Sequence, residues 1–350
     1  GPAEDAAAAL QAGITAAGAG DLQKAAEEWT RAAPLFSQAG DLEKAGLCWW
    51  NAGVAYDRLE RYNDAITCFA GALGVYERLG SRADQAASLC RIAMDRWYLK
   101  RHDEALADYT KALGIYIELG LEKEQADCRR FMGGVHQDCK RHAEAIACLQ
   151  GALDMYTRLG LEKEQADCLH ALGLSCWRLE RHEEAVVQYQ AALAVYERLG
   201  LEEERADCEC NLGRVHTSLG EYERAIELFS VAAERYVRLG NRRGEADCYK
   251  NSGVACRGLG RYDEAIAECE KAIALDPMFG NPYNDIGVYL IELERYEEAV
   301  AWLERATAAP RYDTPQFPYL NLGRAYEEMG EPYRALACYD RALASAPLYL

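Results

Sequence analysis

The sequence predicts an all-α protein, a right-handed α-solenoid of about nine stacked helix pairs. The first observation is a repeat, because the stretch LGLEKEQADC occurs at 119–128 and again, unchanged, at 159–168. The second is composition: only 9 of the 350 residues are proline, while alanine and leucine are abundant, which favours helix. The third is a set of small residues that recur in register along the chain. In such an array each unit contacts only its neighbours, so no single large core is needed.

The recurring small residues form three columns, at intervals of 40 residues in the first part of the chain. The first column is Ala25, Ala65, Ala105, Ala145, Ala185, Ala225, Ala265, Ala299 and Ala335. The second is Ala32, Ala72, Ala112, Ala152, Ala192, Ala232, Ala272, Ala306 and Ala342. The third is Gly13, Gly53, Ala93, Gly133, Gly173, Gly213, Gly253, Gly287 and Gly323. Helices whose axes are about 8–10 Å apart need small side chains at the contact, so these positions predict helix–helix packing.

Each row of the repeat contains two helices. In the sixth row Leu212, Val215 and Leu219 share one helical face, and after a turn at Gly220 a second apolar face begins near Ile226. Glycines also stand at 40, 80, 120, 160, 200 and 240. We expect these glycines to end the second helix of each pair in a left-handed backbone conformation.

The string YLNLGRAYEEMGEPYRALACYDRALASAP at 319–347 resembles a tetratricopeptide repeat (TPR), and similar strings begin near 6, 46, 86, 126, 166, 206, 246 and 280. The residues on the family's signature spacing are Tyr319, Leu322, Gly323, Tyr326, Ala335, Tyr339, Ala342 and Pro347. We therefore expect a cloning scar and disordered start at 1–5, seven units with 40-residue intervals at 6–279, and two units of about 34–36 residues at 280–350. The long repeats resemble Pins/LGN-type adaptors, and the last two units resemble bacterial pilotin-type TPR proteins.

The formal net charge of −18 argues against nucleic acid as a partner, because phosphate binding needs a basic surface. It also opposes docking on an anionic membrane. No apolar run approaches the roughly 20 residues that span a bilayer, so no membrane insertion is expected. These features, with no basic and apolar leader, predict a cytoplasmic protein.

Two columns of reactive residue types are interpreted as packing positions. Cysteine recurs in one of them, at Cys48, Cys128, Cys168, Cys208 and Cys248. Its members lie on equivalent helices of adjacent units, which is too far apart for a disulfide or a shared zinc. The other column alternates His102, His142 and His182 with tyrosine, which indicates a packing ring. Pairing among the other cysteines stays open. The sequence has no nucleotide-binding loop and no nucleophile–base pair, so we predict that the protein is not an enzyme and holds no metal and no cofactor.

Function is expected on the concave face, which the first helix of each pair lines. The candidate peptide-binding residues are Trp50, Asn51, Arg91, Trp97, Tyr98, Arg130, Trp177, Arg178, Asn211, Arg214, Lys250, Asn251 and Arg257. In long-repeat TPR adaptors, asparagines at the place of Asn51 resemble a ladder that binds a peptide backbone, and here Arg91, Phe131 and Ala171 interrupt it. Exposed Trp, Tyr and Arg are the residue types that anchor interfaces.

The sequence therefore predicts a non-enzymatic adaptor, or scaffold, that binds a protein segment in this groove. The expected partner is an acidic or mixed peptide with a bulky apolar anchor, drawn to arginines within an acidic protein. In one alternative, the same side chains only fill the groove or pair with neighbouring aspartates. Two other functions also stay open: a self-assembling scaffold, and a regulatory module cut from a larger protein.

Overall fold

The structure, a computed structural model, describes residues 2–312 and 314–345. Within these residues it has eighteen helices and, apart from one isolated bridge, no strand. The helices are α1 (Pro2–Gly18), α2 (Leu22–Gln38), α3 (Leu42–Arg58), α4 (Tyr62–Leu79), α5 (Arg82–Tyr98), α6 (His102–Leu119), α7 (Glu122–Asp138), α8 (His142–Leu159), α9 (Glu162–Arg178), α10 (His182–Leu199), α11 (Glu202–Ser218), α12 (Tyr222–Leu239), α13 (Arg242–Gly258), α14 (Tyr262–Leu275), α15 (Gly280–Glu292), α16 (Tyr296–Ala308), α17 (Gln316–Glu328) and α18 (Pro332–Ser345). The prediction of an all-α fold built from helix pairs is confirmed.

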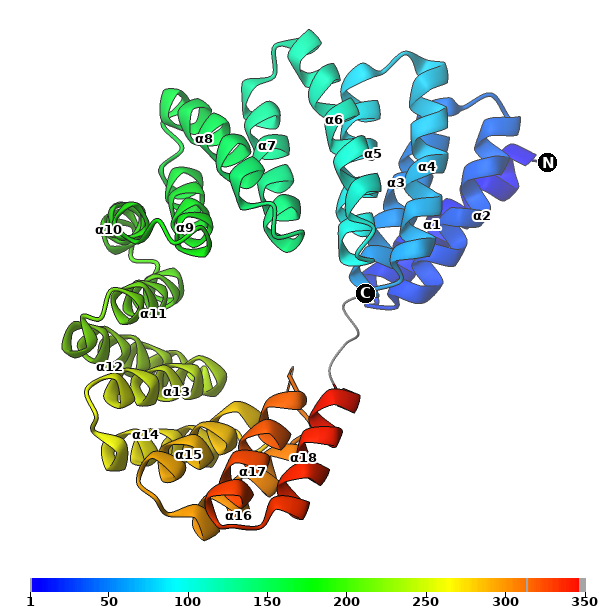
Figure 1. The fold of residues 1–350 in the computed structure, drawn as a ribbon. Coiled ribbons are helices and arrows are strands. Elements are labelled where there is room, and N and C mark those ends of the chain that lie inside the picture. The colour runs from blue at the N-terminus through cyan, green and yellow to red at the C-terminus, as the bar shows by residue number, and fades with distance from the viewer. Residues whose placement is uncertain (1, 313, 346–350) are drawn as a thin grey trace. The chain divides into compact units, whose positions relative to one another are not determined.

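The chain divides into two units, Gly1–Ser175 and Cys176–Leu350. In the first unit each helix from α1 to α7 packs against the next one along the chain, and in the second each helix from α10 to α17 does the same (Figure 1). We call the odd-numbered helices, which come first in each pair, A helices, and the even-numbered ones B helices. In the second unit, neighbouring A helices α11, α13, α15 and α17 also contact one another. The A helices of adjacent pairs therefore form a continuous layer there.

The columns of small residues lie where helices meet, as predicted. Every described member of the two alanine columns is buried, and most have no exposed surface. A Cβ atom added to Gly53 would lie 2.7 Å from the ring of Phe69, and one added to Gly287 would lie 2.4 Å from Leu303. The glycine column therefore receives the large side chain of the partner B helix, and the alanines let the backbones approach closely.

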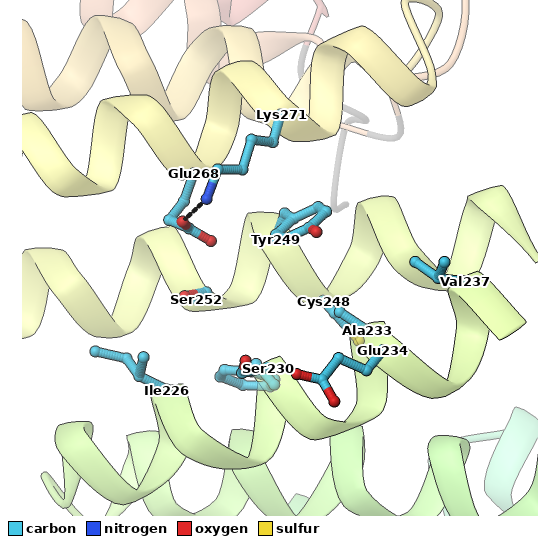
Figure 2. A pocket seen from close by; sticks show the side chains of 11 residues that line it. Ile226, Ser230, Ala233, Glu234, Val237, Cys248, Tyr249, Ser252, Glu268 and Lys271 are labelled. Atoms are coloured by element: carbon cyan, nitrogen blue, oxygen red, sulfur yellow. Dashed lines mark hydrogen bonds and ion pairs between the residues drawn. The ribbon is translucent and has the colours of Figure 1, made fainter.

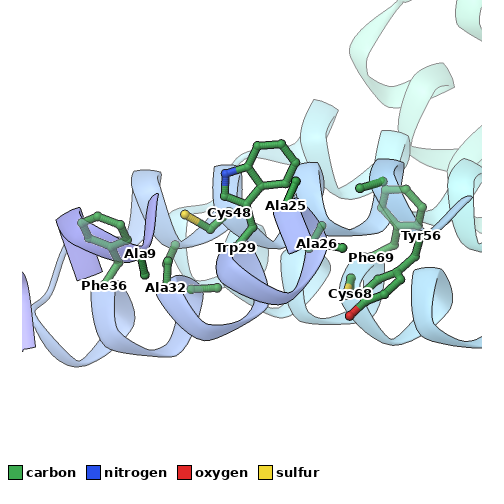
Figure 3. Packing of buried hydrophobic residues seen from close by; sticks show 14 of the residues in the cluster. Ala9, Ala25, Ala26, Trp29, Ala32, Phe36, Cys48, Tyr56, Cys68 and Phe69 are labelled. Atoms are coloured by element: carbon green, nitrogen blue, oxygen red, sulfur yellow. The ribbon is translucent and has the colours of Figure 1, made fainter. Parts of the chain in front are cut away.

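The core of the first helix pairs shows how the small residues of these columns alternate with large side chains. The aromatic rings of Trp29, Phe36 and Phe69 lie among buried alanines such as Ala25 and those beside it (Figure 3). Removing such apolar surface from water is the main stabilising contribution in a folded chain. Because the same alternation recurs in each pair, stability is built locally, from one helix to the next.

The turns after the B helices confirm the expected left-handed ends. Gly80, Gly120, Gly160, Gly200 and Gly240 are the C-cap residues of α4, α6, α8, α10 and α12, with φ between 68° and 70°. The next residue completes the motif: the Leu121 N–H, for example, donates to the Tyr116 carbonyl at 3.0 Å.

The turns between the A and B helices contain left-handed residues that the sequence did not reveal. At this position φ is 56° at Glu60, 61° at Lys100, 59° at Lys140, 59° at Glu180 and 60° at Glu294. In other repeats the same place holds glycine, as at Gly220. The repeat therefore imposes this conformation even on residues with a Cβ, for which it costs about 1–2 kcal/mol.

Residues 2–5 differ from the expectation of a disordered start, because α1 begins at Pro2, and Gly1 lies outside the described residues. Proline suits the first turn of a helix, where its missing N–H is not needed and its φ is already helical. The following residues are rich in alanine, which has the highest helix propensity. Residues 2–5 are therefore helical.

The two segments that break the 40-residue interval contact one another. Phe279 and Arg311 form the isolated parallel bridge, with the Gly280 N–H donating to the Arg311 carbonyl at 2.9 Å. The Arg311 guanidinium lies 2.6 Å from the Asp276 carboxylate. Stacking continues from α14 through α15, so the change in repeat length does not interrupt the array.

Replacing Gly120 by alanine should lower the free energy of unfolding by about 1 kcal/mol, because a Cβ is strained at its φ of 68°. Replacing Lys140 by glycine should cause no loss, since that residue already carries this strain at a φ of 59°. Urea titrations followed by circular dichroism would measure both changes. An equal loss in the two variants would contradict this account of the turns.

Candidate functional site

Three pockets of the described residues lie at one repeated station, a crevice over an A helix between two B helices. One of about 290 Å³ is lined by side chains of α12, α13 and α14, among them Tyr249 and Lys271 (Figure 2). Leu89 and Lys111 line the equivalent crevice four repeats earlier, and Tyr319 and Arg341 line it in the last pair. A crevice that recurs in this way is a feature of the stacked helices and gives no sign of a specific site.

A fourth pocket, of about 360 Å³, lies in the first unit and faces the A helices. We call it the A-face pocket. It is lined by Trp50, Ala87, Cys90, Arg91, Met94, Tyr116, Glu124, Asp127, Cys128 and Phe131. These residues come from α3, α5, α6 and α7, so one pocket spans three successive A helices. It contains Trp50 and Arg91, two of the residues predicted to bind a partner.

The A-face pocket exists because one column of the repeat is broken. In later repeats this column holds aspartate, and the Asp127 carboxylate accepts a hydrogen bond from the Tyr156 hydroxyl at 2.6 Å. Tyr236 donates to Asp207 in the same way. At the equivalent place the third pair has Ala87, which offers no carboxylate to the Tyr116 hydroxyl. Burial, and then the nearby Cys90 thiol, raise the pKa of Tyr116. The short side chain of Ala87 leaves the space that forms the pocket.

Charged groups surround Arg91 at the edge of the A-face pocket. Its guanidinium lies 5.9 Å from the ring of Trp50 and 3.8 Å from the Asp57 carboxylate, and its side chain is 40% exposed. Asp95, one turn further along α5, is only 1% exposed. Burial, and then the neighbouring Asp57 carboxylate, raise the pKa of Asp95 to about 8. Asp95 is thus largely protonated at neutral pH, and Asp57 is the carboxylate that faces Arg91.

Trp97, Tyr98 and Arg130 lie on the same A helices but make contacts of their own. The Trp97 indole N–H donates to the Asp138 carboxylate at 2.8 Å, and its ring lies over Gly134, where an added Cβ would be 2.5 Å away. Trp97 therefore links α5 to α7. The Tyr98 ring is 54% exposed and stacks on Tyr62 at 5.0 Å. Arg130 lies 4.5 Å above the ring of Phe131, a residue of the A-face pocket.

Trp177 and its neighbours belong to the second unit. The Trp177 indole N–H donates to the Ser218 hydroxyl at 3.0 Å, the same link that Trp97 makes in the first unit. The guanidinium groups of Arg178 and Arg214 lie 4.8 Å and 4.4 Å from its ring. Arg214 also donates to the Asn211 side chain at 3.4 Å. One tryptophan, two arginines and one asparagine are thus brought together.

The remaining candidates form smaller groups. Lys250 donates to the Asn251 side chain at 3.4 Å, and the Asn251 amide approaches the Cys210 sulfur at 3.9 Å. Arg257 is exposed on α13, and Asn51 is half-buried on α3. The asparagines of the second unit therefore already contact neighbouring side chains.

Several residues of the A-face pocket were missed by sequence reasoning, namely Ala87, Cys90, Met94, Tyr116 and Glu124. The signal that could have found them is the alanine at 87 in a column that elsewhere holds Asp127, Asp167, Asp207 and Asp247. The alternative in which these aspartates neutralise the arginines of the A face is not seen at Asp127. Its carboxylate is bound by Lys123 at 2.8 Å and by Tyr156.

The cysteine and histidine columns occupy packing positions. The column cysteines are buried, and all fourteen cysteines are free. His102, His142 and His182 are half-buried at the first residues of α6, α8 and α10. Within the described residues, no three or more His, Cys, Asp or Glu side chains are grouped so that they could hold a metal ion. One contact was not anticipated: the sulfurs of Cys90 and Cys128 lie 3.5 Å apart.

Family models of the tetratricopeptide repeat match residues 47–118, 124–198 and 204–278, which is more than half of the chain. Further models of the same repeat match 257–317 and 318–347. The chain belongs to the tetratricopeptide repeat family. The comparison with curated protein sequences finds no significant match.

Among solved structures, this TPR protein is similar in fold to three Rap or phosphatase structures. The apo form of RapI matches with a TM-score of 0.58 and 14% identity, over 75% of this chain and 97% of that one. Aspartyl phosphate phosphatase F from Bacillus subtilis matches with a TM-score of 0.58 and 16% identity, over 90% of this chain and 75% of that one. A Rap protein complexed with competence and sporulation factor matches with a TM-score of 0.53 and 16% identity, over 97% of each chain. At these identities the likeness shows the fold alone. Across the described part of the chain, every helix is too short or too polar to cross a membrane.

The raised pKa of Asp95 predicts a stability that falls as pH rises. In the unfolded chain this carboxyl has a pKa near 4, whereas in the folded chain it is about 8, so the folded state holds the proton between these values. The contribution of neutral Asp95 is complete below about pH 4 and is lost as pH approaches about 8. Asp95→Asn keeps the shape without the ionisation. It should be more stable than the wild type at about pH 8, by about 1 kcal/mol or more, with little difference at about pH 4.

Urea titrations at the two pH values would measure this difference. Asp103→Asn is the matched control, because the Asp103 side chain is 83% exposed and should not change the pH dependence. If Asp95→Asn and the wild type lose stability in parallel between the two pH values, Asp95 is not held in its neutral form.

Proposed function

We propose that this TPR protein is a non-enzymatic adaptor that binds a segment of a partner protein along its A helices. The observation that carries the proposal is the A-face pocket, which breaks the repeat and is lined mainly by apolar atoms of side chains such as Trp50, Met94 and Phe131. TPR arrays are generally protein-interaction modules that use the surface of their first helices. A pocket of about 360 Å³ has room for a bulky apolar side chain of the partner.

The charges around the pocket favour acidic residues next to that anchor. Asp127 is already neutralised by Lys123, with an N–O distance of 2.8 Å. Arg91 is less committed, because its ion pair with Asp57 is long, at 3.8 Å, and two-fifths of its side chain is exposed. A partner carboxylate beside the pocket could therefore bind Arg91, and the net charge of −18 would disfavour acidic segments elsewhere on the surface.

The second unit offers a similar set of groups for the same class of partner. Arg178 and Arg214 hold their guanidinium groups within 4.8 Å of the Trp177 ring, a combination that is enriched at interface hot spots. Asn211, Lys250, Asn251 and Arg257 continue along α11 and α13. We propose that these groups contact the backbone and acidic side chains of a bound segment, since an amide both donates and accepts hydrogen bonds.

Two further observations agree with this role. A Rap protein of similar fold has been solved in complex with competence and sporulation factor, so the fold can accommodate a bound factor. The fourteen cysteines are spread over a large chain, whereas disulfide frameworks are typical of small secreted domains, and this favours a reducing compartment such as the cytoplasm.

A second candidate function is self-association through α18. Leu336 and Leu343 are 59% and 74% exposed. They follow column alanines, and the equivalent Ile266 and Ile273 pack into the core where the array continues. Terminal repeats usually carry a polar outer face, so this surface fits a scaffold that stacks on another copy. It equally fits a regulatory module whose stack continues into another part of a larger protein. Light scattering at several protein concentrations would detect the self-associating form.

The adaptor proposal is tested by selecting peptides from a displayed random library on the immobilised full chain. Enriched peptides should combine one aromatic or large aliphatic residue with acidic neighbours. Arg91→Ala should weaken their binding by roughly 1–3 kcal/mol, as measured by calorimetry, because it removes the cation at the pocket edge. The matched control is Arg158→Ala, which removes an exposed arginine from the B helix α8.

Equal binding by wild type, Arg91→Ala and Arg158→Ala would show that the peptides bind elsewhere. A library that yields no enriched peptide would argue against the adaptor proposal and favour the self-association tested by light scattering.

A further inference from the structure

Two cysteines of the A-face pocket face each other across adjacent repeats. The Cys90 sulfur on α5 lies 3.5 Å from the Cys128 sulfur on α7. Both residues line the pocket. Cys90 is half-buried, whereas Cys128 is only 1% exposed. One thiol is thus open to reagents that enter the pocket, and the second lies directly behind it.

A similar arrangement occurs in the second unit, where Cys210 and Cys248 lie close enough that each shifts the pKa of the other, down for Cys210 and up for Cys248. Each pair is 38 residues apart, which joins the A helices of neighbouring repeats. Cys168 occupies the same column as Cys128 and Cys248 but has the arginine Arg130 at the facing place. A cysteine of this column faces a thiol where the residue 38 positions earlier is also a cysteine, as at Cys90 and Cys210. Cys168, which faces Arg130, is a natural control position.

We propose that Cys90 and Cys128 are a modification site, at which a small-molecule disulfide such as glutathione disulfide oxidises the two thiols to a disulfide between repeats. A disulfide holds its sulfurs about 2.0 Å apart, so the two sulfurs approach by about 1.5 Å from their present 3.5 Å. This movement draws α5 towards α7 and narrows the A-face pocket. The consequence for peptide binding rests on the proposed function; the disulfide itself does not.

The order of the reaction follows from the two environments. The interaction with Cys90 and burial both raise the pKa of the Cys128 thiol, so Cys128 keeps its proton. The half-buried Cys90 thiol loses its proton to solvent, and its thiolate attacks one sulfur of the glutathione disulfide, which forms a mixed disulfide and expels one glutathione thiolate. Cys128 then loses its proton to solvent, and its sulfur attacks the Cys90 sulfur and expels the second glutathione thiolate. Two protein thiols lose two electrons and two protons, and the oxidant becomes two glutathione thiols.

The disulfide is tested on the full chain carrying Cys210→Ser, so that the second pair cannot react. The reduced protein is incubated with glutathione disulfide under native conditions, its remaining thiols are alkylated, and tryptic peptides are analysed by mass spectrometry. Peptides 83–91 and 124–129 should be found joined, with the loss of two free thiols. Adding Cys90→Ser or Cys128→Ser should abolish the joined peptides, whereas adding Cys168→Ser should leave them unchanged.

Circular dichroism checks that each variant is folded, and the two serine variants provide independent tests if one is not. Cys90 that carries glutathione without a joined peptide, or thiols that stay free in the folded chain, would overturn the proposal. Joined peptides that appear only after denaturation would also overturn it.

The effect on the pocket is measured with the acidic peptide most enriched in the library selection. Oxidation of the Cys210→Ser chain should raise the Kd of this peptide about tenfold, and added Cys90→Ser should make the Kd insensitive to oxidation. If the Kd of the peptide is unchanged after complete cross-linking, the proposed narrowing of the pocket is wrong, although the disulfide itself is confirmed. If the library yields no peptide, the proposed function fails, and peptide mapping still decides whether the disulfide forms.

Discussion

The close approach of each A helix to its B helix is the constraint on which the rest of the structure depends. Ala265 and its column equivalents have little or no exposed surface, and a Cβ at Gly213 would lie 2.7 Å from the ring of Phe229. Such packing leaves little tolerance for larger side chains at these stations. Because the stations are fixed, variation is confined to the crevices between B helices and to the surface of the A helices.

Contacts between successive A helices use the residues that the sequence suggested for binding. The Trp97 indole donates to Asp138, and the Trp177 indole donates to Ser218. Gln137, which was not among the candidates, makes a similar contact, because its amide donates to the Ser175 hydroxyl at 2.8 Å. The three donor side chains are half-buried, so part of each remains on the surface of the helix layer. The same residues can therefore fix the spacing of neighbouring repeats and present aromatic or amide groups to a partner. A rigid surface of this kind loses less entropy on binding.

The fold could be predicted almost completely from the sequence, because small residues that recur at fixed intervals indicate where helices pack closely. The left-handed glycine at Gly120 followed from helix-termination rules, but the same conformation at Lys140 did not, since no local signal marks it. The A-face pocket could be predicted only in part. Trp50 and Arg91 were found from residue type. Tyr116 was missed because it lies on the B helix α6, and only A helices were expected to line the binding face. Side-chain contacts between neighbouring repeats depend on the exact stacking distance, which the sequence pattern does not contain.

One change in the repeat accounts for the distinct chemistry of the A-face pocket. Where Asp127 accepts a hydrogen bond from the Tyr156 hydroxyl, Ala87 offers no carboxylate to Tyr116, which lies near the Cys90 thiol. The missing carboxylate opens the space beside Arg91 and at the same time removes a negative charge that would compete for its guanidinium. The wall of the same pocket carries the Cys90 thiol, next to the buried Cys128. An apolar cavity and an available cation therefore share one origin, and at this place they adjoin a facing pair of thiols. The second facing pair, Cys210 and Cys248, lies in a repeat that keeps Asp207, so ligand binding and oxidation are expected to be coupled at the A-face pocket.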